Sequence, residues 1–452
     1  MLSDVRHDDR LAFAELRKRE FARLDDAGIA YLDYTGSALH GASQLERYIE
    51  LVQGGVFGNP HSEHAPSRAS TAMLARACEA TLAFFDVDAA THAVCFTANA
   101  SAAIKLVAES YPFGPRRGLV LAADNHNSVN GMRVFARRAG APVQVLALDG
   151  QLRLLQPDVH LARMGPGLLA FPAQSNFSGV RHPLALVEQA KASGHDVLLD
   201  AASFVGNARL SLRNCPADFT AISVYKMFGF PTGVGALIAR RSALDKLCRP
   251  WFAGGSVDFV SVQNERHQLR PELEGFEDGT PNFLGVAGVP IGLEFLLSVG
   301  SERLARHCAE LTASFLDGLN RLKHTNGAPK AMMYGPRNGE QRGATVAFNL
   351  LDADGAVLPY ADIEARLGAS GIAVRGGCFC NPGAAEAAFG LDGMAAQRCF
   401  DSVGAAFSLA RFASCMGDTS PVGALRASFG AATSLEDVER AIAAASASSG
   451  SA

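Results

Sequence analysis

Lys226 is the side chain of this sequence that is best placed for covalent chemistry. It lies in Ser223–Gly235, between two apolar runs that predict strands, and it is one of only seven lysines. Asp200 ends an earlier apolar run. A lysine amine can form a Schiff base with an aldehyde cofactor, and a carboxylate can keep a pyridinium nitrogen protonated. Each residue alone would be an ordinary turn lysine or strand-end cap, but together they predict a pyridoxal phosphate site.

A phosphate group needs hydroxyls and free backbone N–H groups at the start of a helix. Phe96–Ile104 predicts a strand, a turn of small residues and then a helix, with Ala100 and Ser101 at the turn. Ser223 and Tyr225, which precede Lys226 at the end of the same predicted strand, would add two more hydroxyls. Ser101 could instead be an ordinary helix N-cap, so this segment supports the cofactor site without establishing it.

His126 follows a predicted strand directly, within the polar segment Asp124–Val129. An imidazole in this place could cover the face of a ring cofactor and could also relay a proton. A histidine in a polar loop is more often merely solvated. Its position at the end of a strand is therefore what supports the assignment.

A second chemical cluster is Val374–Gly383, where Cys378 and Cys380 lie between two glycines and an Asn-Pro-Gly run. These flanks predict a mobile loop that presents a thiol, and the nearby Arg375 would favour the thiolate. A C-x-C pair could also be half of a zinc site. No second Cys/His pair lies at zinc spacing, so we expect a nucleophilic cysteine and no metal site.

The composition predicts a soluble globular protein. The chain has 452 residues, is 48% apolar and carries a formal net charge of -4 from interspersed charges. That pattern disfavours a nucleic-acid partner or a polybasic membrane anchor. No apolar run reaches the ~18 residues of a membrane span, and the N-terminus lacks a signal-peptide layout, so we expect a cytoplasmic protein. The nine cysteines are scattered, which predicts free thiols rather than a disulfide framework.

Short apolar runs alternate with helix-like segments between residues 93 and 239. Strands that are buried on both faces and joined by helices predict a mostly parallel α/β sheet, with its ligand at the carboxyl ends of the strands. His126, Asn176, Asp200 and Lys226 all follow such ends. The predicted strands are Ala93–Phe96, Leu119–Ala122, Val143–Leu148, Leu168–Phe171, Val197–Leu199, Phe219–Ser223 and Gly235–Ala239, and the helices between them include Ala102–Ser110, Val129–Ala139 and Leu184–Ala192.

The pattern changes after about residue 300, where longer helices over Glu302–Leu322 and Leu435–Ala444 surround short strands such as Thr345–Asn349. We therefore predict a large cofactor-binding domain at 60–300 and a smaller α+β domain formed by 1–59 and 301–452. In its N-terminal part we expect a helix over Leu11–Leu24 and an extended segment at Tyr31–Tyr34. The Ala/Ser/Gly tail at 443–452 is expected to fray.

The chain resembles class V aminotransferase-fold enzymes of the cysteine desulfurase group, and most closely the desulfurase-like portion of molybdenum cofactor sulfurases. The resemblance implies a pyridoxal phosphate-dependent transferase of fold type I that acts on L-cysteine, passes sulfur to an acceptor and forms a homodimer. Matching motifs occur in order over nearly the whole chain, at Tyr31–Asp33, Gly58–Ser62, Asp124–Val129, Leu199–Val205, Tyr225–Gly229, Phe276–Thr280, Gly377–Asn381 and Arg426–Gly430.

The resemblance also implies roles for the residues around the cofactor. Lys226 resembles the lysine that binds the cofactor covalently, His126 the stacking histidine, and Asp200 the partner of the pyridinium nitrogen. Asn176 resembles the asparagine that orients cofactor and substrate. Thr280 resembles the threonine that reaches the phosphate bound in the neighbouring subunit.

On the substrate side, Arg426 resembles the arginine that binds the substrate carboxylate, a task suited to a bidentate guanidinium. Arg375 is the second arginine that the motifs place near the substrate. Counted from Arg375, the persulfide-forming cysteine is Cys380 rather than Cys378.

The sequence departs from the desulfurase pattern at four positions. Ser203 stands where desulfurases place a glutamine against the pyridoxal hydroxyl, and Tyr225 replaces a histidine, as in the sulfurases. Asn99 and Ala100 replace a glycine and a threonine in the phosphate loop. Sulfurases also carry a C-terminal domain for the pterin cofactor, which lies outside this sequence, so the acceptor is left open, with molybdenum cofactor as one candidate.

We therefore predict a cysteine desulfurase that converts L-cysteine to L-alanine and leaves a persulfide on Cys380. A C–S lyase or an aminotransferase on the same fold is the alternative, because neither needs a loop cysteine. A non-catalytic scaffold is a further alternative, since fold alone does not define function. The presence of Lys226, Asp200 and His126 together argues against it.

Overall fold

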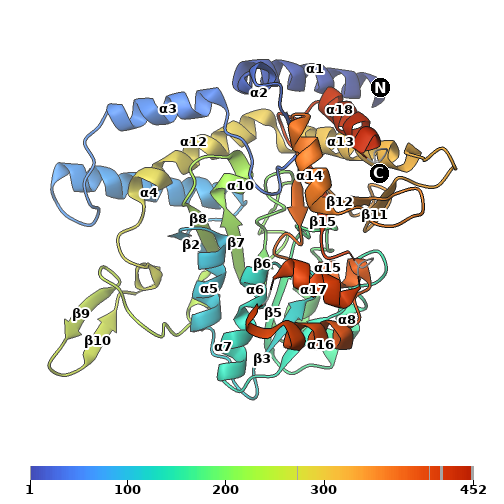
Figure 1. The fold of residues 1–452 in the computed structure, drawn as a ribbon. Coiled ribbons are helices and arrows are strands. Elements are labelled where there is room, and N and C mark those ends of the chain that lie inside the picture. Colours follow the sequence, from blue (N-terminus) through green and yellow to red (C-terminus); the bar gives the residue numbers. More distant parts are fainter. Residues whose placement is uncertain (1, 272, 407, 418–420, 449–452) are drawn as a thin grey trace.

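The computed structural model describes residues 2–271, 273–406, 408–417 and 421–448. A seven-stranded sheet, in the order β2-β8-β7-β6-β5-β3-β4, forms its centre (Figure 1). All its neighbouring strands pair in parallel except β8, which runs antiparallel to both neighbours. The strands are β2 (His92–Thr97), β3 (Gly118–Ala122), β4 (Val143–Leu146), β5 (Gly167–Pro172), β6 (Asp196–Asp200), β7 (Phe219–Ser223) and β8 (Gly235–Arg240).

Every strand predicted for this sheet is present, so the mostly parallel α/β arrangement is confirmed. The reason lies in burial on both faces. Leu119 and Leu121 of β3 belong to one apolar cluster, whereas Val120 and Ala122 of the same strand belong to another. A strand that is covered on both sides reads as a continuous apolar run, which is the pattern that the sequence shows.

Helices fill the crossovers between these strands. α5 (Ala100–Ser110) packs against β7 and β8, and α7 (Met132–Arg138) packs against β3 and β4. The predicted helix over Val129–Ala139 is interrupted at Gly131, which separates α6 (Asn127–Asn130) from α7. The remaining helices of this region are α8 (Pro157–Ala162), α9 (Leu186–Ala192), α10 (Val224–Phe228) and α11 (Arg241–Leu244).

A second, antiparallel sheet is built from the C-terminal part of the chain in the order β11-β12-β15-β14. Helices α13 and α14 pack against it, α18 packs against these two helices, and α1 lies along α13 (Figure 1). The bounds are β11 (Ala331–Tyr334), β12 (Thr345–Leu350), β14 (Arg375–Gly377), β15 (Ala424–Ser428), α1 (Leu2–Glu20), α2 (Arg23–Asp26), α13 (Ser301–Arg321), α14 (Tyr360–Ala369) and α18 (Leu435–Ser448). The domain division at residues 59 and 300 stays a prediction.

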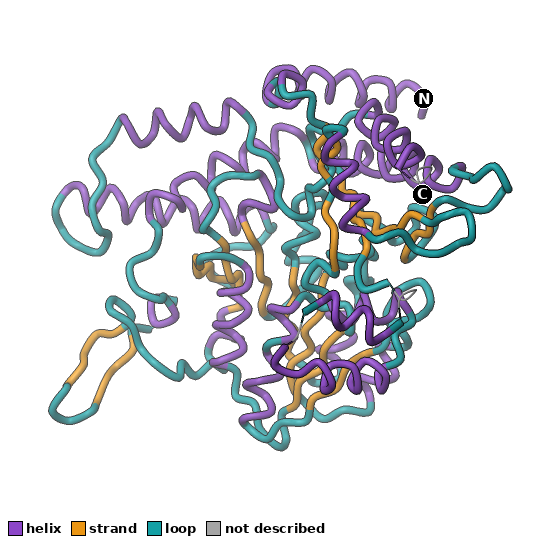
Figure 2. The backbone as a smooth tube through the Cα atoms, viewed as in Figure 1, coloured by secondary structure: helices purple, strands orange, loops and turns teal. Residues whose placement is uncertain are grey.

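The N-terminal segment joins this second region through β1 (Ala30–Tyr31), which pairs in parallel with β13 (Ile372–Ala373). The chain then runs through α3 (Ala42–Gln53) and α4 (Ala65–Phe84), and both helices pack against α12 (Phe283–Val299). The antiparallel hairpin of β9 (Val257–Ser261) and β10 (Arg266–Leu269) projects away from the rest of the chain (Figure 2). The sequence pattern does not indicate this hairpin, because its strands are largely exposed.

The remaining elements are η1 (Glu274–Phe276), α15 (Pro382–Phe389), α16 (Gly393–Val403), η2 (Gly404–Ala406) and α17 (Leu409–Met416). Within the described ranges, no single helix is long and apolar enough to cross a bilayer, and α12 with α13 reaches that length only as a pair bent by 69°.

Two expectations from the sequence are wrong, one about the cysteines and one about the C-terminal tail. Cys399 and Cys415 form a disulfide between α16 and α17, so not all nine cysteines are free thiols. The helical hairpin brings the two cysteines together, although their spacing of 16 residues did not suggest a pair. The tail expected to fray from residue 443 is helical as far as Ser448, because Ala445 packs into the apolar core. Residues 449–452 lie outside the described chain.

Gly229 ends α10, the helix that carries Lys226, and its backbone has φ +79. A Cβ atom at this position would lie 2.3 Å from the backbone nitrogen of His40 and 2.5 Å from the carbonyl carbon of Leu39. A glycine is therefore needed here both for its conformation and for the close approach of the N-terminal segment.

We predict that Gly229→Ala destabilises the protein by roughly 3 kcal/mol, as the sum of a positive-φ penalty and a backbone overlap. Gly327→Ala is the matched control, because Gly327 has φ +84 but nothing within 4 Å of the added Cβ. That control should cost only about 1 kcal/mol. Urea-induced unfolding measures both values. Equal losses in the two variants would show that the contact with the N-terminal segment contributes nothing.

Candidate active site

Lys226 lies in the short helix α10, one turn after the end of β7, where it faces a cavity of about 170 Å³. The cavity is formed at the carboxyl ends of the parallel strands, where α/β sheets bind their ligands. Its lining is Asn99, Ala100, Ser101, Ile104, His126, Ser128, Pro172, Gln174, Asn176, Asp200, Ala202, Ser203, Ser223, Tyr225 and Lys226. Nine of the thirteen residues predicted for the site are in this set, and Thr280, Arg375, Cys380 and Arg426 are not.

The start of α5 forms one end of the cavity. Asn99 is the N-cap, since its side chain accepts a hydrogen bond from the backbone N–H of Ala102 at 3.0 Å, so Ser101 is not the cap. The backbone N–H of Ala100 donates to Ser223 Oγ at 2.9 Å, and Ser101 Oγ bonds to Ser128 Oγ. A helix N-terminus with three serine hydroxyls around it is suited to an anion such as a phosphate group.

Asp200 and His126 face the same cavity from two other strands. Asp200 is 8% exposed, and its Oδ1 accepts from the backbone N–H of Ala202 at 3.0 Å. The Nδ1 atom of His126 accepts from the backbone N–H of Ser128 at 3.1 Å, which places the ring proton on Nε2. Burial and the positive charge of Lys226 lower the pKa of His126, so its ring is neutral near pH 7.

Burial lowers the pKa of Lys226 below its ordinary value, and the charge of Arg426 acts in the same direction. The negative charges of Asp200 and of a Cys380 thiolate oppose this effect. A lowered pKa increases the fraction of neutral amine, which is the nucleophilic form. The amine, the carboxylate, the imidazole and the anion-binding helix end together fit pyridoxal phosphate.

Arg426 and Arg375 both donate hydrogen bonds to Asp33, a residue for which no role was predicted. Asp33 is 7% exposed, and its Oδ1 accepts from Arg426 Nη2 at 2.9 Å. Its Oδ2 accepts from Arg375 Nη2 at 2.6 Å and from Nε at 3.0 Å. Arg375 was expected to favour a thiolate, but its guanidinium is paired with this carboxylate. Two guanidiniums and one carboxylate leave one net positive charge.

Arg426 is only 2% exposed and is linked directly to the cavity. Its Nη1 donates to the backbone carbonyl of Asn176 at 3.0 Å, and its guanidinium lies 4.7 Å from the centre of the Phe379 ring. Burial lowers the pKa of Arg426 even though Asp33 raises it. The arginine predicted to bind a carboxylate therefore lies behind Asn176, one residue layer from the cavity.

The segment around Cys380, expected from the sequence to be a mobile loop, is a short turn between β14 and α15 that is anchored by hydrogen bonds. Asn381 is fully buried and donates from Nδ2 to the carbonyl of Asp124 at 2.7 Å and to Asn176 Oδ1 at 2.8 Å. Asn176 Nδ2 donates in return to the carbonyl of Phe379 at 2.7 Å. The glycines and the Asn-Pro pair suggested flexibility, but here Asn381 caps α15 and holds the turn in place.

Cys378 and Cys380 differ in exposure and bonding. The Cys378 thiol donates to the carbonyl of Val422 at 3.0 Å, and burial raises its pKa. Cys380 is exposed, with φ 55, and its carbonyl accepts from the backbone N–H of Asn127 at 2.7 Å. A buried thiol of raised pKa is a poorer nucleophile. Of the two thiols in the turn, Cys380 is exposed and Cys378 is of intermediate exposure.

Thr280 is exposed and contributes nothing to the cavity of its own chain. The cavity also contains residues without a predicted role. Gln174 and Ser128 are two of them, and only their spacing from Asn176 and His126 in the sequence could have suggested their positions. Asp33 could have been noted as the charged end of a predicted extended segment.

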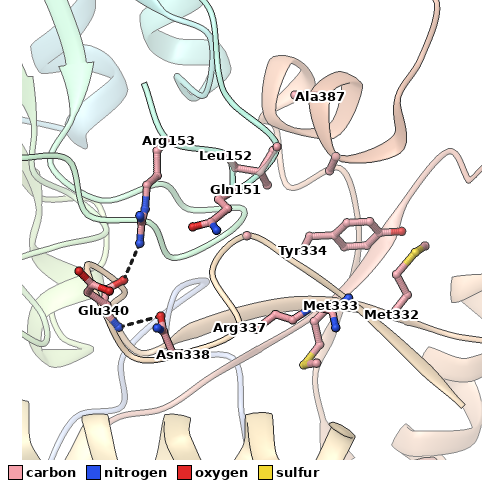
Figure 3. Close-up of a pocket in the computed structure, with 13 residues that line it drawn as sticks. Gln151, Leu152, Arg153, Met332, Met333, Tyr334, Arg337, Asn338, Glu340 and Ala387 are labelled. Atoms are coloured by element: carbon pink, nitrogen blue, oxygen red, sulfur yellow. Dashed lines mark hydrogen bonds between the residues drawn. The ribbon is translucent and has the colours of Figure 1, made fainter. Parts of the chain in front are cut away.

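A larger cavity of about 620 Å³ lies elsewhere, between β11, the loop before β12 and the far end of α15 (Figure 3). Arg153 bonds there to the carbonyl of Glu340 at 3.3 Å, and the Glu340 N–H bonds to Asn338. None of the residues predicted for the site lines it. Cavity size alone therefore does not locate the chemistry in this molecule.

Known proteins resemble the chain over most of its length. It is 35% identical over 456 residues to a human molybdenum cofactor sulfurase, with 94% of this chain and 50% of the relative covered. The sulfurase of Arabidopsis thaliana is 32% identical over 479 residues, with 95% of this chain and 57% of the relative covered. The chain thus spans about half the length of these curated relatives.

Solved structures of cysteine desulfurases share the fold. The apo enzyme from Thermococcus onnurineus NA1 is 25% identical, with a TM-score of 0.76 over 95% of this chain and 96% of that chain. A cysteine desulfurase from Escherichia coli is 23% identical, with a TM-score of 0.75 over 96% and 98%. These likenesses confirm the predicted fold class. The model of the family "Aminotransferase class-V" matches residues 30–441, and the chain therefore belongs to the class-V aminotransferase family.

Proposed function

We propose that the protein is a pyridoxal phosphate-dependent cysteine desulfurase that takes sulfur from L-cysteine onto Cys380 and leaves L-alanine. The observation that carries the proposal is the proximity of three groups. The Lys226 amine shares a cavity with Asp200, and the negative charge of a thiolate on the exposed Cys380 acts on the amine's pKa. A lyase or an aminotransferase has no use for that thiol.

Five groups of the cavity would hold the cofactor. Lys226 would bind it covalently, Asp200 would pair with the ring nitrogen, and His126 would cover the ring. The phosphate would lie at the start of α5, against Ser101 and Ser223. When bound, pyridoxal phosphate supplies an electron sink for breaking bonds at the substrate's α and β carbons.

The chain's own residues would carry the remaining steps. Lys226, once released from the cofactor, would accept the proton from the substrate's α carbon, a role that its lowered pKa favours. The neutral His126, with its proton on Nε2, would be a hydrogen-bond donor toward the bound substrate. The net positive charge around Asp33 would hold the substrate carboxylate through Arg426 and Asn176.

Sulfur transfer balances without any external oxidant. The Cys380 thiolate attacks the substrate's sulfur, the C–S bond breaks, and its electron pair remains on the carbon skeleton. Protonation of that carbon yields alanine, and Cys380 is left as a persulfide. The turn that carries the thiol would be held for this step by the hydrogen bonds of Asn381 and Asn176.

The persulfide needs an acceptor, for which we propose molybdenum cofactor, on the support of the sulfurase relatives. We also propose a homodimer. Thr280 is exposed and lies outside its own chain's cavity, so a second chain could use it at the phosphate, as the resemblance implies.

Lys226→Ala should abolish the visible absorbance of the purified protein and the adduct that borohydride makes permanent, because the amine is the covalent anchor. Lys105→Ala is the matched control, since Lys105 pairs with Glu109 on the outer face of α5. Absorption spectra measure the visible band of each variant, and mass spectra of the reduced protein detect the adduct. An adduct that persists in Lys226→Ala would refute the assignment.

Cys380→Ser should retain the cofactor spectrum and still change it on addition of cysteine, but alanine production should fall by at least ~100-fold for want of a soft nucleophile. Cys378→Ser should retain most activity, because that thiol is bonded to Val422. Alanine assays and mass spectrometry of the persulfide make the comparison. Full alanine production by Cys380→Ser would favour a lyase or an aminotransferase.

Arg426→Ala should reduce kcat/KM for cysteine by roughly 10- to 100-fold, the value of a charge-assisted hydrogen bond, mainly through KM. Arg375→Ala should have a smaller effect, because the Arg375 side chain is 51% exposed whereas that of Arg426 is 3% exposed. Steady-state kinetics with cysteine show which of the two variants loses more kcat/KM. A larger loss in Arg375→Ala would place the substrate carboxylate at that arginine instead.

A further inference from the structure

Gln174 is a buried amide at the cavity wall with an unused donor. It lies in the segment after β5, is 1% exposed and lines the same cavity as Lys226. Its Oε1 accepts from Arg181 Nε at 3.0 Å. Its Nε2 has no hydrogen-bond partner among the described residues. A buried N–H group without a partner is unfavourable, which indicates that a ligand completes it.

The orientation of this amide follows from its neighbour. A guanidinium can only donate hydrogen bonds, so the side-chain oxygen of Gln174 must face Arg181 and the nitrogen must point elsewhere. Arg181 is itself held over the ring of Phe204 at 5.1 Å. A Cβ atom at Gly343 would lie 1.8 Å from Gln174 Oε1, so the glycine leaves room for this oxygen. The amide is therefore fixed on one side and free to donate on the other.

The order of the strands indicates which oxygen it meets. β7, β6 and β5 are adjacent in the sheet. The anion-binding Ser223 belongs to β7, Asp200 ends β6, and Gln174 follows β5. In pyridoxal phosphate, the phosphate arm and the phenolic oxygen lie on opposite sides of the axis through the ring nitrogen. With the phosphate on the β7 side and the nitrogen at Asp200, the phenolic oxygen falls on the β5 side.

We propose that Gln174 is a cofactor-binding residue whose Nε2–H donates to the phenolate oxygen of pyridoxal phosphate. Ser203, at the position where desulfurases carry a glutamine for this oxygen, has its donor two bonds closer to the backbone than a glutamine would. The amide that donates to this oxygen would thus come from the segment after β5 rather than from the segment after β6, where Ser203 lies. This inference rests on the cofactor assignment above and not on the desulfurase reaction.

The bond would have a measurable electrostatic effect. In the bound cofactor, the proton on the Lys226 nitrogen is held partly by the negative phenolate oxygen. A donor to that oxygen reduces its negative charge and makes the proton easier to lose. Gln174 should therefore lower the pH at which the Lys226-linked cofactor loses this proton, and removing the donor should raise it.

The test is a pH titration of the cofactor's visible absorbance in the full-length protein. Gln174→Leu should raise the midpoint by about one pH unit, the value of one hydrogen bond to a charged group. Gln174→Asn, whose amide is one methylene shorter and is less disruptive to folding, should raise it in the same direction. Ser203→Ala is the matched control and should leave the midpoint unchanged.

A rescue variant makes the test specific. Ser203→Gln in the Gln174→Leu background should return the midpoint toward the wild-type value, because it restores an amide to the same oxygen. An unchanged midpoint in folded Gln174→Leu and Gln174→Asn would overturn the proposal. A shift in Ser203→Ala, or a raised KM for cysteine with an unchanged midpoint in Gln174→Leu, would also overturn it. Loss of the visible band in Lys226→Ala tests the cofactor assignment separately.

Discussion

The carboxylate of Asp33 holds together the parts of the molecule on which the substrate side of the site depends. It pairs with Arg375 on β14 and Arg426 on β15, residues more than 340 positions away along the chain. Removing one partner of a buried ion pair typically costs about 3–5 kcal/mol, because the other charge remains without compensation. Together with the pairing of β1 and β13, this residue therefore joins the N-terminal segment to the C-terminal sheet, and it sets the charge that a substrate carboxylate would meet.

A second constraint joins this charged layer to the cofactor cavity. Asn176 lines the cavity, accepts Arg426 on its backbone carbonyl and exchanges side-chain hydrogen bonds with the Phe379–Asn381 turn. All of these groups are buried, so each bond that is lost would leave an unpaired polar atom in the interior. The thiol of Cys380 is thereby held by a network rather than carried on a free loop. Sulfur transfer in this chain would depend on the accuracy of that network.

Much of the fold could be read from the sequence because its signals are local. A strand buried on both faces is an apolar run wherever it lies, and β3 and β5 were recognised for that reason. The rule that parallel strands present their carboxyl ends to a ligand then brought Lys226, Asp200 and His126 together correctly. The hairpin of β9 and β10 was missed, since its strands are largely exposed and show no such run. The capping role of Asn381 was not predicted, because a capping asparagine and a loop asparagine look alike in sequence.

The sequence by itself indicated the layered fold and the candidate residues Lys226, Asp200 and His126 through residue type and strand-end position, and the choice of Cys380 came from its motif resemblance to desulfurases. Only the tertiary structure decided the hydrogen-bond and ion-pair partners. That Asp33 neutralises Arg375, that Arg181 orients Gln174 and that Cys399 meets Cys415 are all results of packing. Ion pairs, amide orientations and disulfides act over a few ångströms in space. Residues at such distances can be hundreds of positions apart along the chain, where no local pattern records their contact.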